Sequence, residues 1–244
     1  PGADAGAKIA AAIADLPSTG GTVDARGLEG AQTATATITL NKAVKLILSP
    51  TLSLTASANP AFDITTNLAS IEGNGATISY TGTGTAIRVG GVSYTAVRHL
   101  RVIGHNTAST IGLLVGSTGG VTTTTYNKFE ELRLSSFAVG VKLDGTTGSG
   151  TYTNSFIEII SRDNTVTGGI GFQLIPTTSN FANANTFVGC SAEANNSDGW
   201  KISGANGNSF LSVRSELNGG YGWNFSGAAT NNTFQGVWGE TNTS

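Results

Sequence analysis

The sequence predicts an all-β fold, a single-stranded parallel β-helix or solenoid, with a short α-helix over its first end. An Asn-x-Phe motif recurs at intervals of 27, 31, 23 and 24 residues, at Asn127, Asn154, Asn185, Asn208 and Asn232. Each copy is followed by an alternating run such as FEELRLS or FLSVRSE. A period of about 20–50 residues is typical of solenoids, propellers and arrays. Strand-type alternation excludes helical repeats, and the unit is too short for a propeller blade.

The composition indicates a folded chain with many turns. Gly accounts for 34 of the 244 residues and charged residues for only 11%, yet 39% are hydrophobic and recur in short alternating runs. The formal charge is −2, so the chain lacks the basic footprint that binds nucleic acid. No stretch approaches the ~20 apolar residues that cross a bilayer, so we expect no membrane insertion.

The first element is expected over residues 4–16, DAGAKIAAAIADL. Asp4 can cap the helix, and Ile9, Ile13 and Leu16 share one face at helical spacing. Pro17 and the glycines after it end the helix. Because the end of a solenoid is an open sheet edge, this helix is expected to cover it.

Residues 22–244 are then expected to form the rungs of one domain that spans 1–244. Three short strands with intervening bends fit one rung, and rungs stack about 4.8 Å apart. Equivalent residues should therefore form columns: an asparagine ladder at a bend, and a phenylalanine stack inside. Trp200 and Trp223 align and are expected in the core, as is Cys190. The chain stops after a full rung without a covering helix, which predicts either a homotrimer or a truncated monomer.

The opening GADAGAKIAAAIADLPSTGGTVDARG resembles the entry segment of pectate-lyase-superfamily right-handed β-helix proteins. In that superfamily an Ala-rich helix and a GG-[TV]-V strand start the solenoid. Its members include pectate lyases, polygalacturonases and phage tailspikes. The resemblance covers the first ~30 residues by motif, and it implies a right-handed helix, a polysaccharide partner and an extracellular, cell-surface or virion-surface location. Of the polygalacturonase motifs, only Gly104-His105-Asn106 is partly matched, and no Asp-Asp pair is present.

The alternation after each Phe predicts which side chains face out. Positions +1, +3 and +5 should point inward, and +2, +4 and +6 outward. The +2 column is His99, Glu131, Glu158, Gly189, Ser212 and Gly236. The +4 column is Arg101, Arg133, Ile160, Ser191, Arg214 and Trp238, and the +6 column is Ile103, Ser135, Arg162, Glu193, Glu216 and Glu240.

These outward columns hold much of the chain's few charges, which predicts a polar groove for a saccharide. Carboxylates on adjacent rungs repel unless a cation or a neighbouring Arg compensates, and they suit acid–base chemistry or Ca²⁺. The candidate catalytic residues are Glu158, Arg162, Glu193, Arg214 and Glu216. The candidate substrate-binding residues are Arg101, Glu131, Arg133, Tyr126, Tyr152, Phe181, Trp238 and Glu240, the tyrosines and Phe181 lying in longer loops expected beside the groove.

Three functions remain open on the sequence. The first is a tailspike-like domain that binds polysaccharide, the second a polysaccharide lyase or glycoside hydrolase, and the third a structural spacer or adhesin stalk. No cofactor is expected, although the paired carboxylates are available for Ca²⁺. The charged columns equally suit a solvated sheet face that prevents lateral association.

Overall fold

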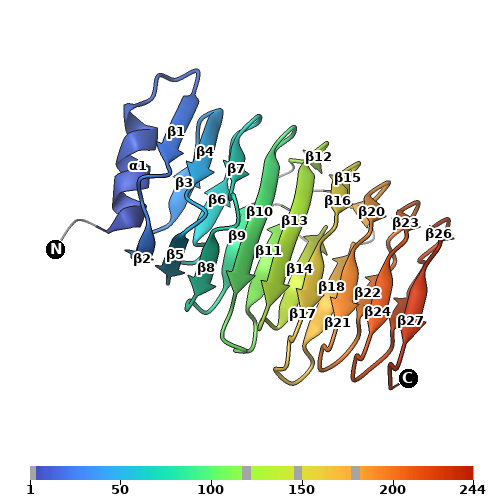
Figure 1. The fold of residues 1–244 in the computed structure, drawn as a ribbon. Helices are drawn as coiled ribbons and strands as arrows, with labels where there is room; N and C mark the ends of the chain where they lie inside the picture. The colour runs from blue at the N-terminus through green and yellow to red at the C-terminus, as the bar shows by residue number, and fades with distance from the viewer. Residues whose placement is uncertain (1–3, 117–121, 146–149, 177–181, 244) are drawn as a thin grey trace.

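The structure, a computed structural model, describes residues 4–116, 122–145, 150–176 and 182–243. Helix α1 (Ala5–Asp15) lies across the N-terminal end of the stacked strands, and the two chain ends lie at opposite ends of the molecule (Figure 1). Asp4 caps α1, because its side chain accepts a hydrogen bond from the Ala7 amide at 3.1 Å. Ile9 and Ile13 are buried beneath the helix, so the predicted covering helix is confirmed.

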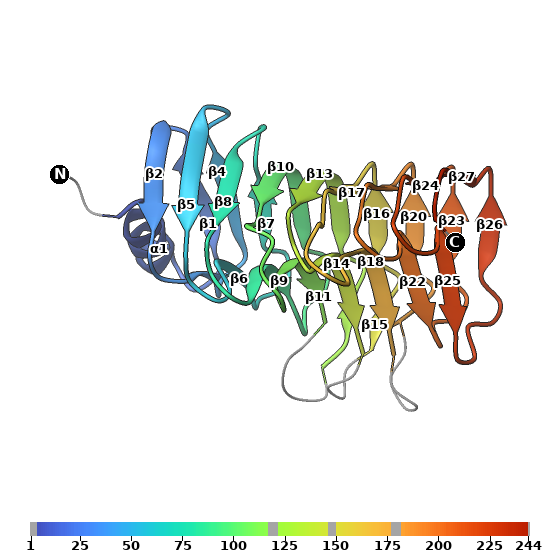
Figure 2. The ribbon, with the colours of Figure 1, turned by 90° about the horizontal axis from the view of Figure 1, so that it is seen from below.

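The chain winds through about eight turns of a right-handed solenoid whose strands pair in parallel on three faces (Figures 1 and 2). The first face contains β1 (Gly21–Ala25), β4 (Val44–Leu48), β7 (Ser70–Glu72), β10 (Ala96–Ile103), β13 (Lys128–Ser135), β16 (Ser155–Ile157), β20 (Thr186–Val188), β23 (Ser209–Leu211) and β26 (Thr233–Gln235). The second contains β2 (Gly30–Ala34), β5 (Leu52–Ala56), β8 (Thr77–Tyr80), the ends of β10 and β13, β17 (Ile160–Arg162), β21 (Ser191–Glu193), β24 (Arg214–Glu216) and β27 (Trp238–Glu240).

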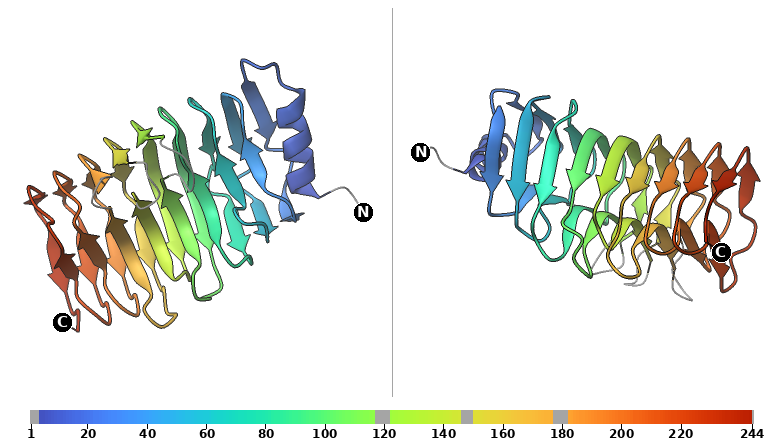
Figure 3. Two further views of the ribbon diagram at one scale, coloured as in Figure 1. Left: turned by 180° about the vertical axis from the view of Figure 1, so that it is seen from behind. Right: turned by 60° about the horizontal axis from the view of Figure 1, so that its bottom comes forward.

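The third face completes each turn. It contains β3 (Ile38–Leu40), β6 (Phe62–Ile64), β9 (Thr85–Val89), β11 (Ile111–Val115), β14 (Val139–Asp144), β18 (Ile170–Ile175), β22 (Trp200–Ser203) and β25 (Trp223–Ser226). Three two-residue strands, β12 (Thr124–Thr125), β15 (Thr151–Tyr152) and β19 (Ala182–Asn183), pair at the turn from the third face back to the first. The view from behind shows the rungs as regular layers (Figure 3).

Aromatic columns fill the interior. Phe129, Phe156, Phe187, Phe210 and Phe234 stack with successive ring centroids 4.9, 4.7, 5.0 and 4.7 Å apart. Trp200 is fully buried and stacks on Trp223 at 5.1 Å. Cys190 is also fully buried, and burial raises its pKa to about 12, so it acts as a small hydrophobe. These core predictions are confirmed except near the C-terminal end of the stack, where Trp223 is partly buried and Phe234 is 36% exposed.

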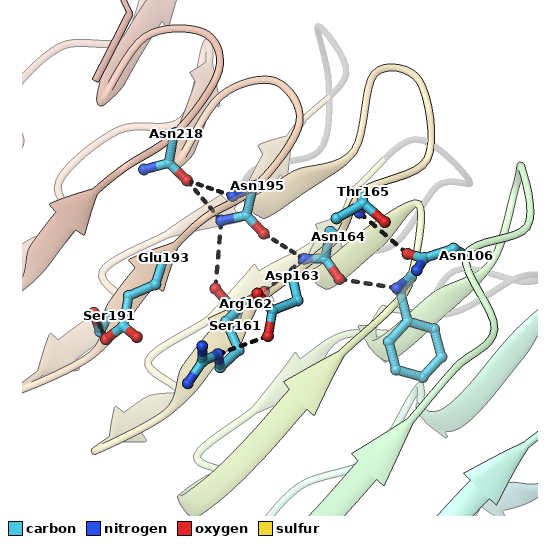
Figure 4. Close-up of polar contacts among 11 residues, drawn as sticks. Asn106, Ser161, Arg162, Asp163, Asn164, Thr165, Ser191, Glu193, Asn195 and Asn218 are labelled. Carbon is cyan, nitrogen blue, oxygen red and sulfur yellow. Dashed lines mark hydrogen bonds and ion pairs between the residues drawn. The ribbon is translucent and has the colours of Figure 1, made fainter. Parts of the chain in front are cut away.

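Two ladders of buried asparagines hold the corners of the rungs. The first contains the predicted Asn127, Asn154, Asn185, Asn208 and Asn232, each side-chain amide donating to the next side-chain oxygen at 3.0–3.1 Å. The second contains Asn164, Asn195, Asn218 and Asn242, between the second and third faces. Figure 4 shows the first three of these asparagines. The sequence predicted a ladder, and the structure contains two.

The first and second faces meet at a bend made by one residue per rung. The bend residue has a positive φ in His99 (52°), Glu131 (50°), Glu158 (54°), Gly189 (61°), Ser212 (52°) and Gly236 (62°). This left-handed residue interrupts the strand alternation, so the prediction that +1 side chains point inward is wrong. Glu130, at +1, lies on the outer surface and pairs with Arg98 at 2.5 Å and Lys128 at 2.6 Å. Positions +3 and +5 point inward as predicted, as with Leu132 and Leu134.

Candidate functional site

A groove of about 1270 Å³ follows the bend between the first and second faces. It is lined by the bend residues His99, Glu131, Glu158, Gly189 and Ser212 and by Arg101, Arg133, Ile160 and Arg214 from the +4 column. Arg26, Pro50, Asn74, Gly75 and Leu100 complete its N-terminal part. The residues come from every rung between β1 and β24, so the groove follows the solenoid axis for roughly 30 Å at about 4.8 Å per rung.

Arg101 and Arg133 lie side by side in the groove. Their Cα atoms are register partners on β10 and β13, so the two exposed side chains start about 4.8 Å apart. Neither guanidinium forms a hydrogen bond or ion pair with another described residue. Two guanidinium groups at such spacing repel each other by about 1 kcal/mol in water. An anion placed between them would replace this repulsion with two attractions.

The other two arginines of the groove already have carboxylate partners within the protein. Arg26 forms an ion pair with Asp24 at 2.6 Å. Arg214 lies 3.8 Å from Glu193 and 3.6 Å from Glu216, so its guanidinium offsets the repulsion between these two carboxylates on adjacent rungs. The arginine pair at 101 and 133 is thus the part of the groove best suited to a ligand's negative charge.

His99 lies between two carboxylates at the centre of the groove. Its Nδ1 is 2.6 Å from a Glu72 oxygen, and its Nε2 is 3.3 Å from a Glu131 oxygen. The hydrogen bond to Glu72 is the main reason that the pKa of His99 is raised, with the charge of Glu131 adding to it. The sequence placed His99 in an outward column, but its two partners come from neighbouring rungs and only the fold shows them.

Glu158 occupies the bend one rung after Glu131. Its carboxylate forms no ion pair or hydrogen bond with another described residue. It therefore remains available, within the groove, to accept or donate a proton or to share a cation with Glu131.

The candidate catalytic residues do not gather at one point. Glu158 and Arg214 line the groove, whereas Arg162, Glu193 and Glu216 lie in the +6 column of the second face, away from the bend. Arg162 turns to its neighbour Asp163, with 2.8 Å between Nε and the carboxylate (Figure 4). Glu193 accepts a hydrogen bond from the Ser191 hydroxyl at 2.6 Å.

The aromatic candidates lie elsewhere. Tyr126 and Tyr152 occupy the turn before the first face, about 15 Å of extended strand from the bend residues, so they do not flank the groove. Trp238 and Glu240 are exposed on the last rung, where the indole Nε1 lies 3.2 Å from the Glu240 carboxylate. Phe181 lies outside the described residues.

No group of three or more acidic, histidine or cysteine side chains within the described ranges is arranged to hold a metal ion. A Ca²⁺ ion in the groove therefore stays a prediction. Within the described residues, no helix combines the length and the apolar character needed to cross a membrane.

The fold is the right-handed parallel β-helix found in pectate lyases. The solved structure of pectate lyase Pel9A matches 86% of this chain with a TM-score of 0.50 and 17% identity. ORF18 of Geobacillus virus E2 matches 96% of the chain with a TM-score of 0.37 and 15% identity. This chain spans 48% and 57% of the lengths of those two chains, respectively. No protein-family model and no curated protein sequence matches it, and the expected homotrimer stays a prediction.

Proposed function

We propose that the groove binds a polysaccharide chain along the solenoid axis, with acidic groups of the sugar on Arg101 and Arg133. The protein would then be a glycan-binding domain of an extracellular or virion-surface protein, similar in architecture to a tailspike. The unpaired arginine pair in an elongated groove is the observation that carries this proposal.

The length of the groove favours a polymer over a small molecule. A site of roughly 30 Å that repeats at about 4.8 Å per rung offers equivalent contacts to successive units of an extended chain. The charge favours an acidic polymer. Of the four arginines in the groove lining, Arg26 and Arg214 are paired with carboxylates, whereas Arg101 and Arg133 have no such partner among the described residues. Two neighbouring guanidinium groups without a counter-charge attract anions to that part of the groove.

Catalysis is the second candidate, because Glu158 is an unpaired carboxylate within the same groove. A carboxylate close to arginines that bind the sugar's acidic group is positioned for proton transfer in a lyase or hydrolase. Unsaturated uronate products absorbing in the ultraviolet, or new reducing ends, would identify the reaction. Either signal should disappear in Glu158→Gln.

The experiment that tests binding is calorimetric titration with polygalacturonate, alginate and neutral dextran, each with Ca²⁺ and with chelator. We expect an acidic polymer to bind, and the double variant Arg101→Ala/Arg133→Ala to weaken that binding by about a hundredfold, since each charged contact contributes about tenfold. Lys45→Ala, which removes an exposed cation of β4 outside the groove, is the matched control. Raising the salt concentration should weaken binding through screening.

Two results would count against the proposal. An acidic polymer that binds the double variant as tightly as the wild-type protein would show that the arginine pair is not the site. An absence of binding to every polymer would favour the structural spacer, with the charged columns acting as a solvated surface.

A further inference from the structure

A second column of positive-φ residues lies at the opposite edge of the first face from the groove. Its residues directly precede the asparagines of the first ladder or, on the two earlier rungs, Ala69 and Thr95 at the equivalent position. Their φ values are 63° at Leu68, 59° at Tyr94, 57° at Tyr126, 56° at Thr153, 52° at Ala184 and 63° at Gly207. The register of the first face places them on six successive rungs, since the residues two positions later are paired. All six are exposed.

The column is bulky on three rungs and small on the next three. Leu68, Tyr94 and Tyr126 are 64%, 62% and 54% exposed. Tyr94 and Tyr126 stack with their centroids 5.3 Å apart and their planes 7° from parallel. On the following rung the column position is Thr153, and then come Ala184 and Gly207. Among the described residues, this change in size leaves a step beyond Tyr126, because the next two side chains of the column, Thr153 and Ala184, are small.

The backbone makes large side chains costly in this column. A bulky residue is strained at positive φ, whereas glycine, present at 207, is not. Tyrosine twice in succession at such positions, with both rings in solvent, is the kind of local strain that gathers at ligand sites. The residues that precede the two tyrosines are also joined, because the Ser93 and Thr125 hydroxyls form a hydrogen bond of 2.8 Å between the two rungs.

We propose that this step, formed by Tyr126 over Thr153 and Ala184, binds one pyranose ring of a glycan. A ring placed one rung beyond Tyr126 would continue the existing stack at the same spacing, as Thr153 and Ala184 are too small to fill that place. The C–H groups on one face of a pyranose carry slight positive charge and fit the negative face of a phenol ring. The sugar hydroxyls at the rim would remain in water or reach the Thr153 hydroxyl.

The site stands independently of the groove, because it lies at the opposite edge of the first face: Tyr126 and Thr153 each precede the bend residue of their rung, Glu131 or Glu158, by five positions, about 15 Å of extended chain. A neutral glycan distinguishes them, since it gains nothing from the charge of Arg101 and Arg133. The probes are therefore β-1,4-linked hexasaccharides of glucose, galactose and N-acetylglucosamine. Binding is followed by saturation-transfer NMR and by titration.

Thr153→Tyr is the decisive variant. It fills the step with a third ring and should abolish binding of the hexasaccharide while the protein keeps its fold. Tyr126→Ala removes the ring on which the sugar would stack and should weaken binding by about tenfold, as expected for the loss of one stacking contact. Tyr221→Ala, which removes a tyrosine that is 53% exposed on another turn, should bind like the wild-type protein. Circular dichroism and thermal melting of each variant establish that it is folded.

The inference is overturned if none of the hexasaccharides binds at millimolar concentration, or if folded Thr153→Tyr binds as well as the wild-type protein. Binding that survives in Tyr126→Ala but disappears in Arg101→Ala/Arg133→Ala would place the sugar in the groove instead. Loss in the tyrosine variants with retention in the arginine variants supports the step, whatever the groove binds.

Discussion

Replacing Asn154 with alanine should destabilise the solenoid by about 2–5 kcal/mol. Asn154 is 1% exposed, and its oxygen accepts from the backbone amide and the side-chain amide of Asn127, both at 3.0 Å. Its own amide donates to the Thr124 carbonyl at 3.0 Å and to Asn185. Alanine leaves the Asn127 amide and the Thr124 carbonyl without this partner, and each unsatisfied buried group costs about 1–3 kcal/mol.

The matched control is Asn232→Ala, at the last position of the same ladder. Asn232 accepts the equivalent two bonds from Asn208, but it is half-buried, so water can replace the lost partner. Its loss should cost about 1 kcal/mol. Urea unfolding followed by circular dichroism gives both free energies by linear extrapolation. Equal losses in the two variants would refute the reasoning, because burial would then not decide the value of the ladder.

Two further predictions concern the bend. Glu158→Gly should raise the free energy of unfolding by about 1 kcal/mol, because Glu158 has a φ of 54° that glycine adopts without strain; a lower melting temperature would contradict this. His99→Gln should destabilise the protein more at pH 6 than at pH 9. The pKa of His99 is raised in the folded state by Glu72 and Glu131, so its contribution is complete below the unfolded value of about 6.5 and is lost as the pH rises through the folded value. A difference between wild type and variant that does not change with pH would contradict it.

The sequence predicted the solenoid well, because the same residue types recur at equivalent positions of successive rungs, so each rung is independent evidence for the same fold. The Phe column, the Asn ladder and the capping helix each follow from spacing alone, and Trp200 and Trp223 followed from their alignment. The second ladder could have been found by the same search. Asn164, Asn195 and Asn218 recur at nearly the same intervals, without a Phe to mark them.

The site was less predictable, because side-chain partners belong to different rungs. Strand alternation placed Arg101 and Arg133 correctly on the surface. It could not show that Arg133 has no carboxylate partner in the described part of the chain, whereas Arg214 has two. Alternation also failed at Glu130, since the left-handed residue after it resets the pattern. Tyr126 is separate from the groove because its loop lies at the turn from the third face to the first, whereas the groove follows the bend between the first and second faces. The spacing of the repeats did not predict which of these turns carries the loop.

The aligned side-chain amides of the asparagine ladders give the solenoid a dipole along its axis. The backbone amide of each rung can only donate, so the side-chain oxygen on the next rung must face it, as between Asn154 and Asn185. In both ladders each side-chain oxygen therefore faces the preceding rung, and the nitrogen donates to the next asparagine wherever one follows. Aligned amide dipoles add, as they do in an α-helix. A reversed copy of the same rung could not join either ladder without turning its amide dipole against those of the other rungs.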